Sequence, residues 1–453
     1  MNKMVVVWVA IVALLTLKSF QRPAYAVGLY MMTFFVHPSF WWWGDIVEGY
    51  RWNLFAGILL LATLVMTKDT GPPLLQPPTR TNAARILLFM AINAIIVHLL
   101  VAANPDSSFG WLVIRMKFIL LFFMLQYAIR DETDFRIVGM AIALGIGYIG
   151  YEATVNDRGH FNGGRLEGIG AAGVQSANQL ASLLVTAVPL ATTVMFATAK
   201  KWHKGVVILC CALSFNVILL CNSRGAFLGV LAAGVIFMVM ATGPAKKQAT
   251  KVLGLALLGT FLLLGDPEII QRFMTTFSAD TERDSSAQSR IIFWSAAGRM
   301  LADHPYGSGG NSFSEGIGWK YMHGGVEPGD TRAIHNGFIT EATDWGVQGI
   351  AIALLFILAV WRTSWKGRKL AIAAGDANGV MIFACISASL TAWAVSSIFG
   401  DYLNDEWGFW TAAIAYAYLR LYMTQAAAKA VPAPAPVVHT GVVLQPAHRS
   451  FAS

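Results

Sequence analysis

Residues 378–399 read NGVMIFACISASLTAWAVSSIF, a run of 22 residues without a charged side chain. A helix that spans a lipid bilayer needs about 20 consecutive, mostly apolar residues. This stretch has that length, and similar runs recur along the whole chain of 453 residues. Because one buried core cannot hold so many of them, they predict a multi-pass helical membrane protein.

Working outward from this run, we predict thirteen apolar segments of helical length. They cover residues 4–20, 24–43, 52–67, 84–103, 109–129, 135–152, 174–198, 203–221, 225–242, 250–265, 336–361, 378–399 and 407–424. Only Gln21-Arg22-Pro23 separates the first two. One of these two is therefore, in an alternative interpretation, a re-entrant or interfacial piece. The predicted fold class is an all-α integral membrane protein with about 12 (12–13) transmembrane helices.

The composition excludes several other classes of protein. Hydrophobic residues make up 56% of the chain and charged residues only 13%, against roughly a quarter charged in a soluble domain. A soluble enzyme, a secreted disulfide scaffold and a single-pass receptor are all inconsistent with these values. The four cysteines lie inside apolar segments, so we interpret them as small core hydrophobes rather than disulfide partners. They are Cys210, Cys211, Cys221 and Cys385.

The positions of the basic residues predict the orientation in the membrane. The net charge is +8, and in a membrane protein such an excess marks cytoplasmic loops rather than nucleic-acid binding. Basic residues recur in alternate loops, at Lys18/Arg22, Lys68/Arg80/Arg85, Arg130/Arg136, Lys200/Lys201/Lys204, Lys246/Lys247/Lys251 and Arg362/Lys366/Arg368/Lys369. The positive-inside rule predicts that these loops and the C-terminus are cytoplasmic. The lysine-poor loops between them are then periplasmic.

The largest interruption of the apolar pattern is residues 266–335, which the same alternation places outside. Within it, residues 288–302 carry apolar side chains at helical spacing and predict an amphipathic helix that ends at His304-Pro305. These apolar positions are Ile291, Ile292, Trp294, Ala297, Met300 and Leu301. The predicted organisation is a transmembrane bundle over 1–265, this loop over 266–335, transmembrane helices over 336–425 and a disordered cytoplasmic tail over 426–453.

Three arginines break the pattern by lying in predicted outer loops. Arg224 is in a tight turn, Arg165 is in the loop 153–173, and Arg290 opens the amphipathic helix. Together they predict a basic pocket for phosphate, because the guanidinium group donates two parallel hydrogen bonds. In the alternative interpretation, each arginine contacts lipid headgroups or pairs with a local carboxylate.

His335 ends the large loop at the membrane boundary, where an imidazole can act as a general base near neutral pH. If a helix begins there, Glu341 and Asp344 lie on or near the same face. The alternative is a merely solvated histidine at a helix start. Asp344 at membrane depth requires a partner, which we expect to be His335 or one of the arginines.

Metal and nucleotide sites find little support in the sequence. The acidic pairs Asp45/Glu48 and Asp405/Glu406 are the only metal candidates outside the large loop, and neither forms an Asp-x-Asp or histidine-rich cluster. Walker A, dinucleotide and Gly-x-Ser-x-Gly sequences are absent. We therefore predict no metal, no cofactor and no nucleic-acid partner.

Several motifs, taken in order, resemble the O-antigen ligase and O-antigen polymerase-like family. They are Asn222-Ser223-Arg224-Gly225-Ala226; Ser289-Arg290-x3-Trp294 followed by His304-Pro305 and Gly307-Ser308-Gly309; and His335-Asn336 followed by Asp344-x-Gly346-x-x-Gly349. A weaker fourth runs from Arg165 through Gln175-Ser176-Ala177-Asn178-Gln179. The chain departs from the family pattern at Asp344, often Glu in the family, and at Ser308, where Val is more usual.

The resemblance implies a GT-C-like protein of the bacterial inner membrane without a cofactor. It implies transfer of a glycan from undecaprenyl pyrophosphate to an acceptor hydroxyl at the periplasmic face. The acceptor is lipid A–core in ligases, a growing repeat-unit chain in O-antigen or exopolysaccharide polymerases, and a protein Ser or Thr in a third group. The family's essential arginines match Arg224 and Arg290, and its histidine matches His335.

Substrate-binding positions implied in the same way are Arg165, Asn178, Asn336 and Asp344. A transporter is the alternative from a different class of protein. Against it, the sequence shows no pair of interrupted helices in two related halves.

Overall fold

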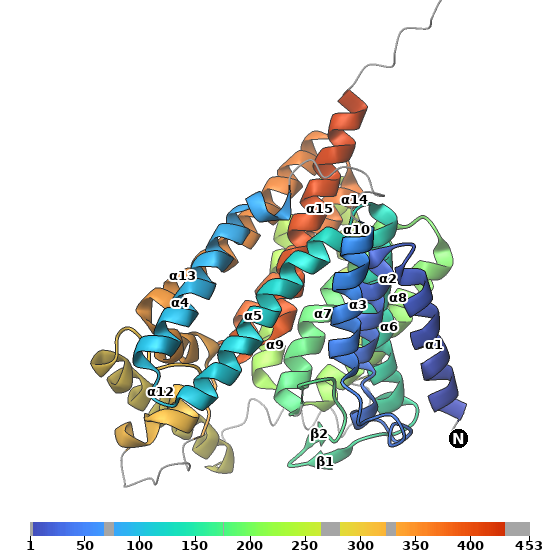
Figure 1. The fold of residues 1–453 in the computed structure, drawn as a ribbon. Coiled ribbons are helices and arrows are strands. Elements are labelled where there is room, and N and C mark those ends of the chain that lie inside the picture. Colours follow the sequence, from blue (N-terminus) through green and yellow to red (C-terminus); the bar gives the residue numbers. More distant parts are fainter. Residues whose placement is uncertain (1–2, 68–76, 175, 264–280, 323–331, 431–453) are drawn as a thin grey trace, which may run out of the picture.

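The computed structural model describes residues 3–67, 77–174, 176–263, 281–322 and 332–430. Nearly all of these residues lie in helices (Figure 1). The described part contains one small antiparallel hairpin, formed by β1 (His160–Asn162) and β2 (Arg165–Glu167). Every segment that the sequence predicts as a membrane helix overlaps a helix of the structure, although some ends differ.

The first ten long helices alternate in direction along the chain (Figure 1). They are α1 (Lys3–Ser19), α2 (Pro23–Phe35), α3 (Trp52–Met66), α4 (Asn82–Val101), α5 (Pro105–Ala128), α6 (Glu132–Thr154), α7 (Ala177–Ala197), α8 (Lys201–Leu220), α9 (Arg224–Met240) and α10 (Pro244–Leu263). The later helices are α12 (Thr281–Asp303), α13 (Gly337–Ala373), α14 (Ala377–Ser396) and α15 (Glu406–Ala430). Short helical turns are η1 (Pro38–Phe40), η2 (Pro78–Arg80), η3 (Ser312–Gly316), η4 (Gly318–Tyr321) and η5 (Tyr402–Asn404).

Seven of the described helices are long and apolar enough to cross a membrane. They are α4, α5, α6, α7, α8, α13 and α14, while α3 and α9 are apolar but shorter. The structure thus confirms an all-α membrane protein, and the number of spans stays a prediction. The tail beyond Ala430 lies outside the described residues, and α15 continues a few residues past the predicted boundary at 425.

One predicted helix is too long. The segment 24–43 forms α2 only as far as Phe35 and then the short turn η1. Pro38 has no backbone N–H and disfavours helical geometry in the residue before it, so the helix ends ahead of it. The tryptophans that follow, Trp41 and Trp43, are buried.

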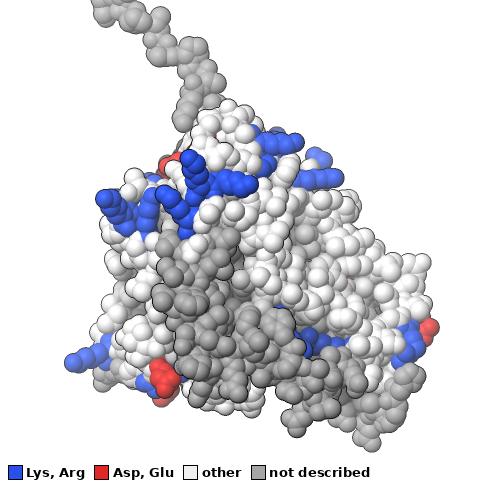
Figure 2. All heavy atoms as spheres, turned by 180° about the vertical axis from the view of Figure 1, so that it is seen from behind, with Lys and Arg blue, Asp and Glu red and all other residues white. Residues whose placement is uncertain are grey.

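Charges divide the bundle into two ends. The end of α1, the starts of α4 and α8 and the end of α13 carry basic residues of the sequence pattern, including Lys18, Arg85, Lys200 and Lys369. These helix ends lie at one end of the bundle, where Lys and Arg side chains gather and which we name the basic end (Figures 1 and 2). The hairpin, α12 and η5 lie at the opposite end (Figure 1). This separation is what the positive-inside pattern predicts.

The core centres on α14, which contacts α7, α9, α13 and α15. Its small polar side chains bond to neighbouring helices: Ser389 donates to the carbonyl of Thr186 at 2.8 Å, and the Ser182 and Ser396 hydroxyls lie 2.8 Å apart. Such contacts satisfy polar groups where water is absent. All four cysteines are free thiols within the bundle, as predicted.

The segment predicted as an amphipathic helix lies in α12, and its buried face differs from the prediction. Phe293, Ala296 and Met300 pack against Phe313 and Ile334. Ile291 and Ile292, which the sequence places on the apolar face, are 63% and 48% exposed.

Candidate functional site

Three segments that are far apart in the sequence bring the predicted arginines together at the end opposite the basic end. Arg165 begins strand β2, and Arg290 is on α12. Arg224 is the first residue of α9, where the Ser223 hydroxyl caps the helix. The pKa of Arg290 is lowered, first by burial and then by the positive charges of Arg165 and Arg224. The three side chains therefore share one electrostatic environment, although distant segments carry them.

Their guanidinium groups have few protein partners. None of the three forms an ion pair with an acidic residue in the described part of the chain. The Nε atom of Arg290 is buried without a hydrogen-bond partner among the same residues. Among the described residues no carboxylate pairs with these arginines, and their role in binding an anion stays a prediction. Unpaired cations that are close together favour an anion.

His335 lies directly before α13 in a left-handed conformation, with φ of 58°. Its backbone N–H donates to Asp401 Oδ2 at 3.3 Å. The Nε1 of Trp294 donates to the carbonyl of Ile334 at 3.1 Å. Because Trp294 is one helical turn after Arg290, this bond connects the arginine helix to the segment that carries the histidine.

The surroundings of His335 keep its imidazole neutral. Its pKa is lowered, chiefly by removal from solvent and further by the charges of Arg290 and Arg332, while Asp401 opposes this effect. The covering is partial, and part of the side chain still contacts solvent. A neutral, accessible imidazole has a free lone pair and can accept a proton.

Asn336 caps α13. Its side-chain oxygen accepts the N–H groups of Phe338 and Ile339 at 3.0 and 3.2 Å. Asparagine is a preferred N-cap because this geometry satisfies otherwise unpaired helix donors. The side chain is buried and holds the start of α13 next to His335. Its role in substrate binding stays a prediction.

The loop between α14 and α15 contributes Asp401 and Tyr402, which the sequence analysis did not select. Asp401 accepts from the Thr340 hydroxyl at 2.5 Å as well as from His335. Tyr402 and Asp401 are the groups that partly offset the charge of Arg290. Burial raises the pKa of Tyr402, which keeps its hydroxyl protonated. Their sequence signal was only a lysine-poor, acidic outer loop.

Asp344 does not have the partner that we expected. The carboxylate accepts the backbone N–H groups of Asn311 and Ser312 at 2.9 and 3.0 Å, and the Ser312 hydroxyl at 2.9 Å. A basic or histidine partner for Asp344 is therefore wrong. Asp344 holds the glycine turn against α13.

The two glycine motifs interlock beside Asp344. Gly346 has φ of 83° and ψ of 175°, so α13 is broken there. The break frees the carbonyl of Asp344, which accepts the N–H of Gly309 at 2.9 Å. Gly307 has φ of 93°, and a Cβ on it would lie 2.6 Å from the backbone nitrogen of Gly346. Only glycine allows this approach of two backbones.

Asn178 lies half-buried in the first turn of α7. Its neighbour Gln179 makes the contact across the bundle, donating to Asp405 Oδ1 at 3.2 Å. The hydrogen bonds of the described residues do not connect Asn178 to the three arginines. Its role in binding remains a prediction.

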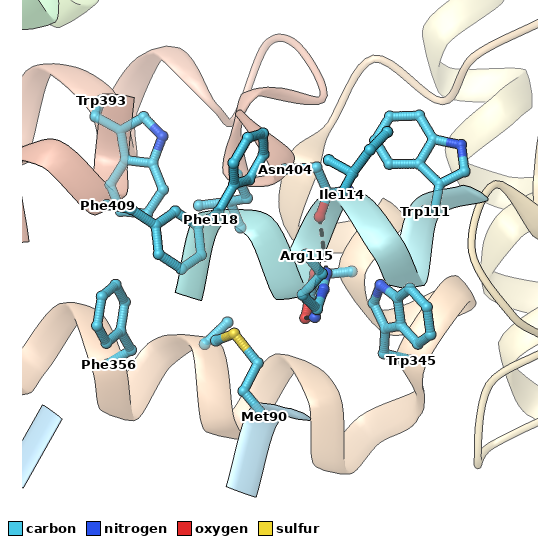
Figure 3. A pocket seen from close by; sticks show the side chains of 13 residues that line it. Met90, Trp111, Ile114, Arg115, Phe118, Trp345, Phe356, Trp393, Asn404 and Phe409 are labelled. Atoms are coloured by element: carbon cyan, nitrogen blue, oxygen red, sulfur yellow. Dashed lines mark hydrogen bonds and ion pairs between the residues drawn. The ribbon is translucent and has the colours of Figure 1, made fainter. Parts of the chain in front are cut away.

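A buried ion pair joins α5 to α13, the helix that begins next to His335. Arg115 on α5 donates to both carboxylate oxygens of Glu341 at 2.7 and 2.6 Å, and to Asn404 at 2.8 Å. The guanidinium also lies over the ring of Trp345, 4.6 Å from its centroid. These residues line a cavity of about 30 Å³ between α5, α13 and η5 (Figure 3). The feature of the sequence that indicates this pair is Arg115, a charged residue inside the predicted apolar segment 109–129.

Of the two acidic pairs considered for a metal, Asp405/Glu406 has other partners. Asp405 accepts from Gln179, and Glu406 accepts from the Tyr30 hydroxyl. Burial raises the pKa of Asp405 well above its usual value, which makes it a poor ligand for a cation. No group of three or more potential metal ligands occurs in the part of the chain that the structure describes.

Comparison with known families supports the resemblance found in the sequence. The family model described as O-Antigen ligase matches residues 209–354. This range contains Arg224, Arg290 and His335, whereas Arg165 lies before it. A comparison with the curated proteins found no match. The resemblance to the O-antigen ligase family is confirmed over the matched range.

Proposed function

We propose that this protein transfers a glycan from undecaprenyl pyrophosphate to an acceptor hydroxyl. Members of the matched family are glycosyltransferase-like enzymes of the ligase or polymerase type. The observation that carries the proposal is a group of three arginines that form no ion pair with any described residue, close to a histidine whose pKa is lowered. One part of this site fits a diphosphate, and the other fits a hydroxyl that must lose a proton.

The arginines act on the leaving group. When the bond between the sugar C1 and the diphosphate oxygen breaks, the departing lipid diphosphate carries both electrons of that bond. Arg165, Arg224 and Arg290 place positive charge where this negative charge develops, which is the most effective position for stabilisation. The partner-free Nε of Arg290 is available to such an oxygen. Three guanidinium groups supply the charge that a divalent cation provides in other transferases, so we propose a metal-independent reaction.

His335 acts on the acceptor. The acceptor oxygen forms the new bond to C1, and its proton passes to the imidazole. The lowered pKa of His335 favours the neutral form that this step requires. Asp401 fixes the backbone of His335 through the N–H at 3.3 Å, and thereby holds the ring near the arginines.

We propose that the reaction takes place at the periplasmic face of the bacterial inner membrane. Support comes from the elements that carry the site: β2 with Arg165, the start of α9 with Arg224, α12 with Arg290 and the start of α13 next to His335 lie at the end opposite the basic end (Figure 1). By the positive-inside rule the basic end is cytoplasmic.

Alanine variants of the three family-matched residues test the proposal. Arg224→Ala and Arg290→Ala should each reduce transfer by about 100-fold or more, since one oxyanion donor is worth about that factor. His335→Ala should cost a similar factor through the lost base. Matched controls at the same end are Arg299→Ala on α12 and His304→Ala directly after it. Transfer by purified protein and its amount in the membrane are both measured. Normal transfer by all three variants contradicts the proposal.

The acceptor that we propose is lipid A–core, as in the ligases. A gel of surface polysaccharide from a deletion strain checks this. We expect the ladder on lipid A–core to disappear while lipid-linked polymer remains. Accumulation of lipid-linked single repeats would instead show a polymerase, and loss of glycan from protein would show a protein transferase.

A further inference from the structure

A second basic site lies at the other end of the bundle. A cavity of about 510 Å³ opens between α4, α5, α13 and α15 at the basic end. We name it the basic cavity; four cations line it, Arg85, Arg362, Lys366 and Arg420. No acidic residue is among the described residues that line it. Like charges that surround one space repel each other unless an anion lies between them.

Buried polar groups in the same wall lack partners. The Gln126 side chain is fully buried, and neither its nitrogen nor its oxygen has a hydrogen bond within the described chain. Arg420 is 6% exposed, and its Nε is likewise buried and unsatisfied. Buried polar atoms are nearly always hydrogen-bonded, so these orphaned groups require a partner.

Part of Arg420 has a structural role. Its Nη2 donates to the carbonyls of Gln126 and Ile129 at 2.5 and 2.9 Å, where α5 ends. These bonds satisfy carbonyls that a helix end leaves unpaired. They do not account for its Nε or for the amide of Gln126. The exposed cations Arg85, Arg362 and Lys366 form no ion pair with any acid of the described residues.

The apolar part of the wall indicates what carries the anion. Leu355 and Leu358 line the cavity and are 53% and 40% exposed on α13. On a helix long and apolar enough to span the bilayer, such side chains face lipid. A ligand with a phosphate among the cations and hydrocarbon along these leucines matches both surfaces. Basic pockets between membrane helices on the cytoplasmic side bind headgroups of this kind.

We propose that the basic cavity binds the phosphate headgroup of an anionic phospholipid. The Gln126 amide and the guanidinium groups donate to the phosphate oxygens, and the acyl chains follow α13. This site is separate from the arginines of the proposed transfer reaction, which lie at the opposite end, and it stands whether or not that reaction is confirmed.

Thermal unfolding of the purified full-length protein in detergent tests the proposal. Dioleoylphosphatidylglycerol should raise the Tm, while dioleoylphosphatidylcholine and sodium phosphate should not at equal concentration. In Arg362→Gln/Lys366→Gln the apparent affinity should fall about 30-fold, at roughly 1 kcal/mol per basic residue. The control Lys246→Gln/Lys247→Gln removes the same charge from the same end, outside the cavity, and should retain the effect.

A further variant separates binding from folding. Gln126→Leu keeps the volume of the side chain and removes the unsatisfied amide, so the Tm without lipid should not fall while the response to phosphatidylglycerol weakens. An unchanged lipid response in both Gln126→Leu and Arg362→Gln/Lys366→Gln overturns the proposal. An equal loss in the Lys246→Gln/Lys247→Gln control also overturns it, because diffuse charge would then explain the effect. Equal stabilisation by sodium phosphate alone overturns the lipid as ligand.

Discussion

At the scale of single residues, the proton affinity of His335 depends on side chains that other segments supply. Removal from solvent lowers its pKa, Arg290 and Arg332 lower it further, and Asp401 raises it. Asp401 belongs to the loop before α15, and Arg290 to α12. The pKa of this one imidazole therefore depends on how several elements are placed around it.

The pH dependence of transfer follows from these shifts. A base works only when it is neutral, so activity should be present above the pKa of His335 and fall as the pH drops through it. Because this pKa is lowered, the acid limb should lie below pH 6.5, the unperturbed value. Asp401→Asn removes a negative charge that stabilises the imidazolium, and should move the acid limb to lower pH. A pH–rate profile of each purified protein measures its acid limb. A limb that lies at higher pH in Asp401→Asn than in the unaltered protein would refute the assignment of His335 as the base.

Gly346 shows how a single backbone conformation holds the site together. Gly346→Ala places a Cβ in the left-handed region, 2.5 Å from the carbonyl carbon of Tyr306. We expect it to lower the free energy of unfolding by about 1–3 kcal/mol. Gly298→Ala on α12 is the matched control, because nothing lies within 4 Å of its added Cβ. It should be neutral or slightly stabilising, as alanine favours a helix. Thermal unfolding compares the two, and equal Tm changes would contradict this account.

At the scale of elements, the site is held between helices that pair through buried charge. Arg115 on α5 and Glu341 on α13 are 7% and 2% exposed. Arg115 also donates to Asn404 of η5, the turn that contains Tyr402 and directly follows Asp401. One guanidinium group therefore joins α5, α13 and η5, two of which adjoin His335 and Asp401 of the proposed reaction site.

Breaking this pair should be costly. Arg115→Met leaves the Glu341 carboxylate buried and unpaired, which typically costs about 3–5 kcal/mol. The double variant Arg115→Met/Glu341→Met removes both charges and should recover most of that loss. The partly exposed pair Arg136–Glu132, 3.8 Å apart, is the control, and Arg136→Met should cost less than about 1 kcal/mol. Thermal unfolding of the four proteins measures the difference. A double variant no more stable than Arg115→Met would show that the unpaired Glu341 carboxylate is not the cause of the loss.

At the scale of the whole molecule, Lys and Arg side chains gather at the basic end (Figure 2), and the elements that carry the three site arginines and His335 lie at the other end (Figure 1). The two ends differ in purpose if the proposals hold. The basic end sets orientation and binds lipid, and the opposite end performs the transfer.

Cysteine labelling tests this orientation. Tyr306→Cys, at a side chain that is 70% exposed near α12, should react with a membrane-impermeant maleimide in intact spheroplasts. Lys369→Cys, at the basic end, should react only after the membrane is permeabilised. The native cysteines lie within the bundle and provide the background reading. The reverse pattern would place the arginines in the cytoplasm and end the periplasmic proposal.

The sequence by itself determined where the helices lie, because the length of an apolar run depends only on the thickness of the bilayer. It also predicted the two charged ends and the residues Arg165, Arg224, Arg290 and His335. It could not show which side of a helix is buried. On α4, Leu87 is fully buried and Leu100 is 76% exposed, since lipid accepts the same side chains as the core does.

Only the tertiary structure decided which polar groups meet. It paired Arg115 with Glu341, gave Asp344 backbone donors in place of a cation, and brought Asp401 and Tyr402 to Arg290. Each of these contacts joins segments far apart in the chain. Whether they meet depends on how the helices pack and on a break such as Gly346, and neither is encoded in the spacing of residues along one helix.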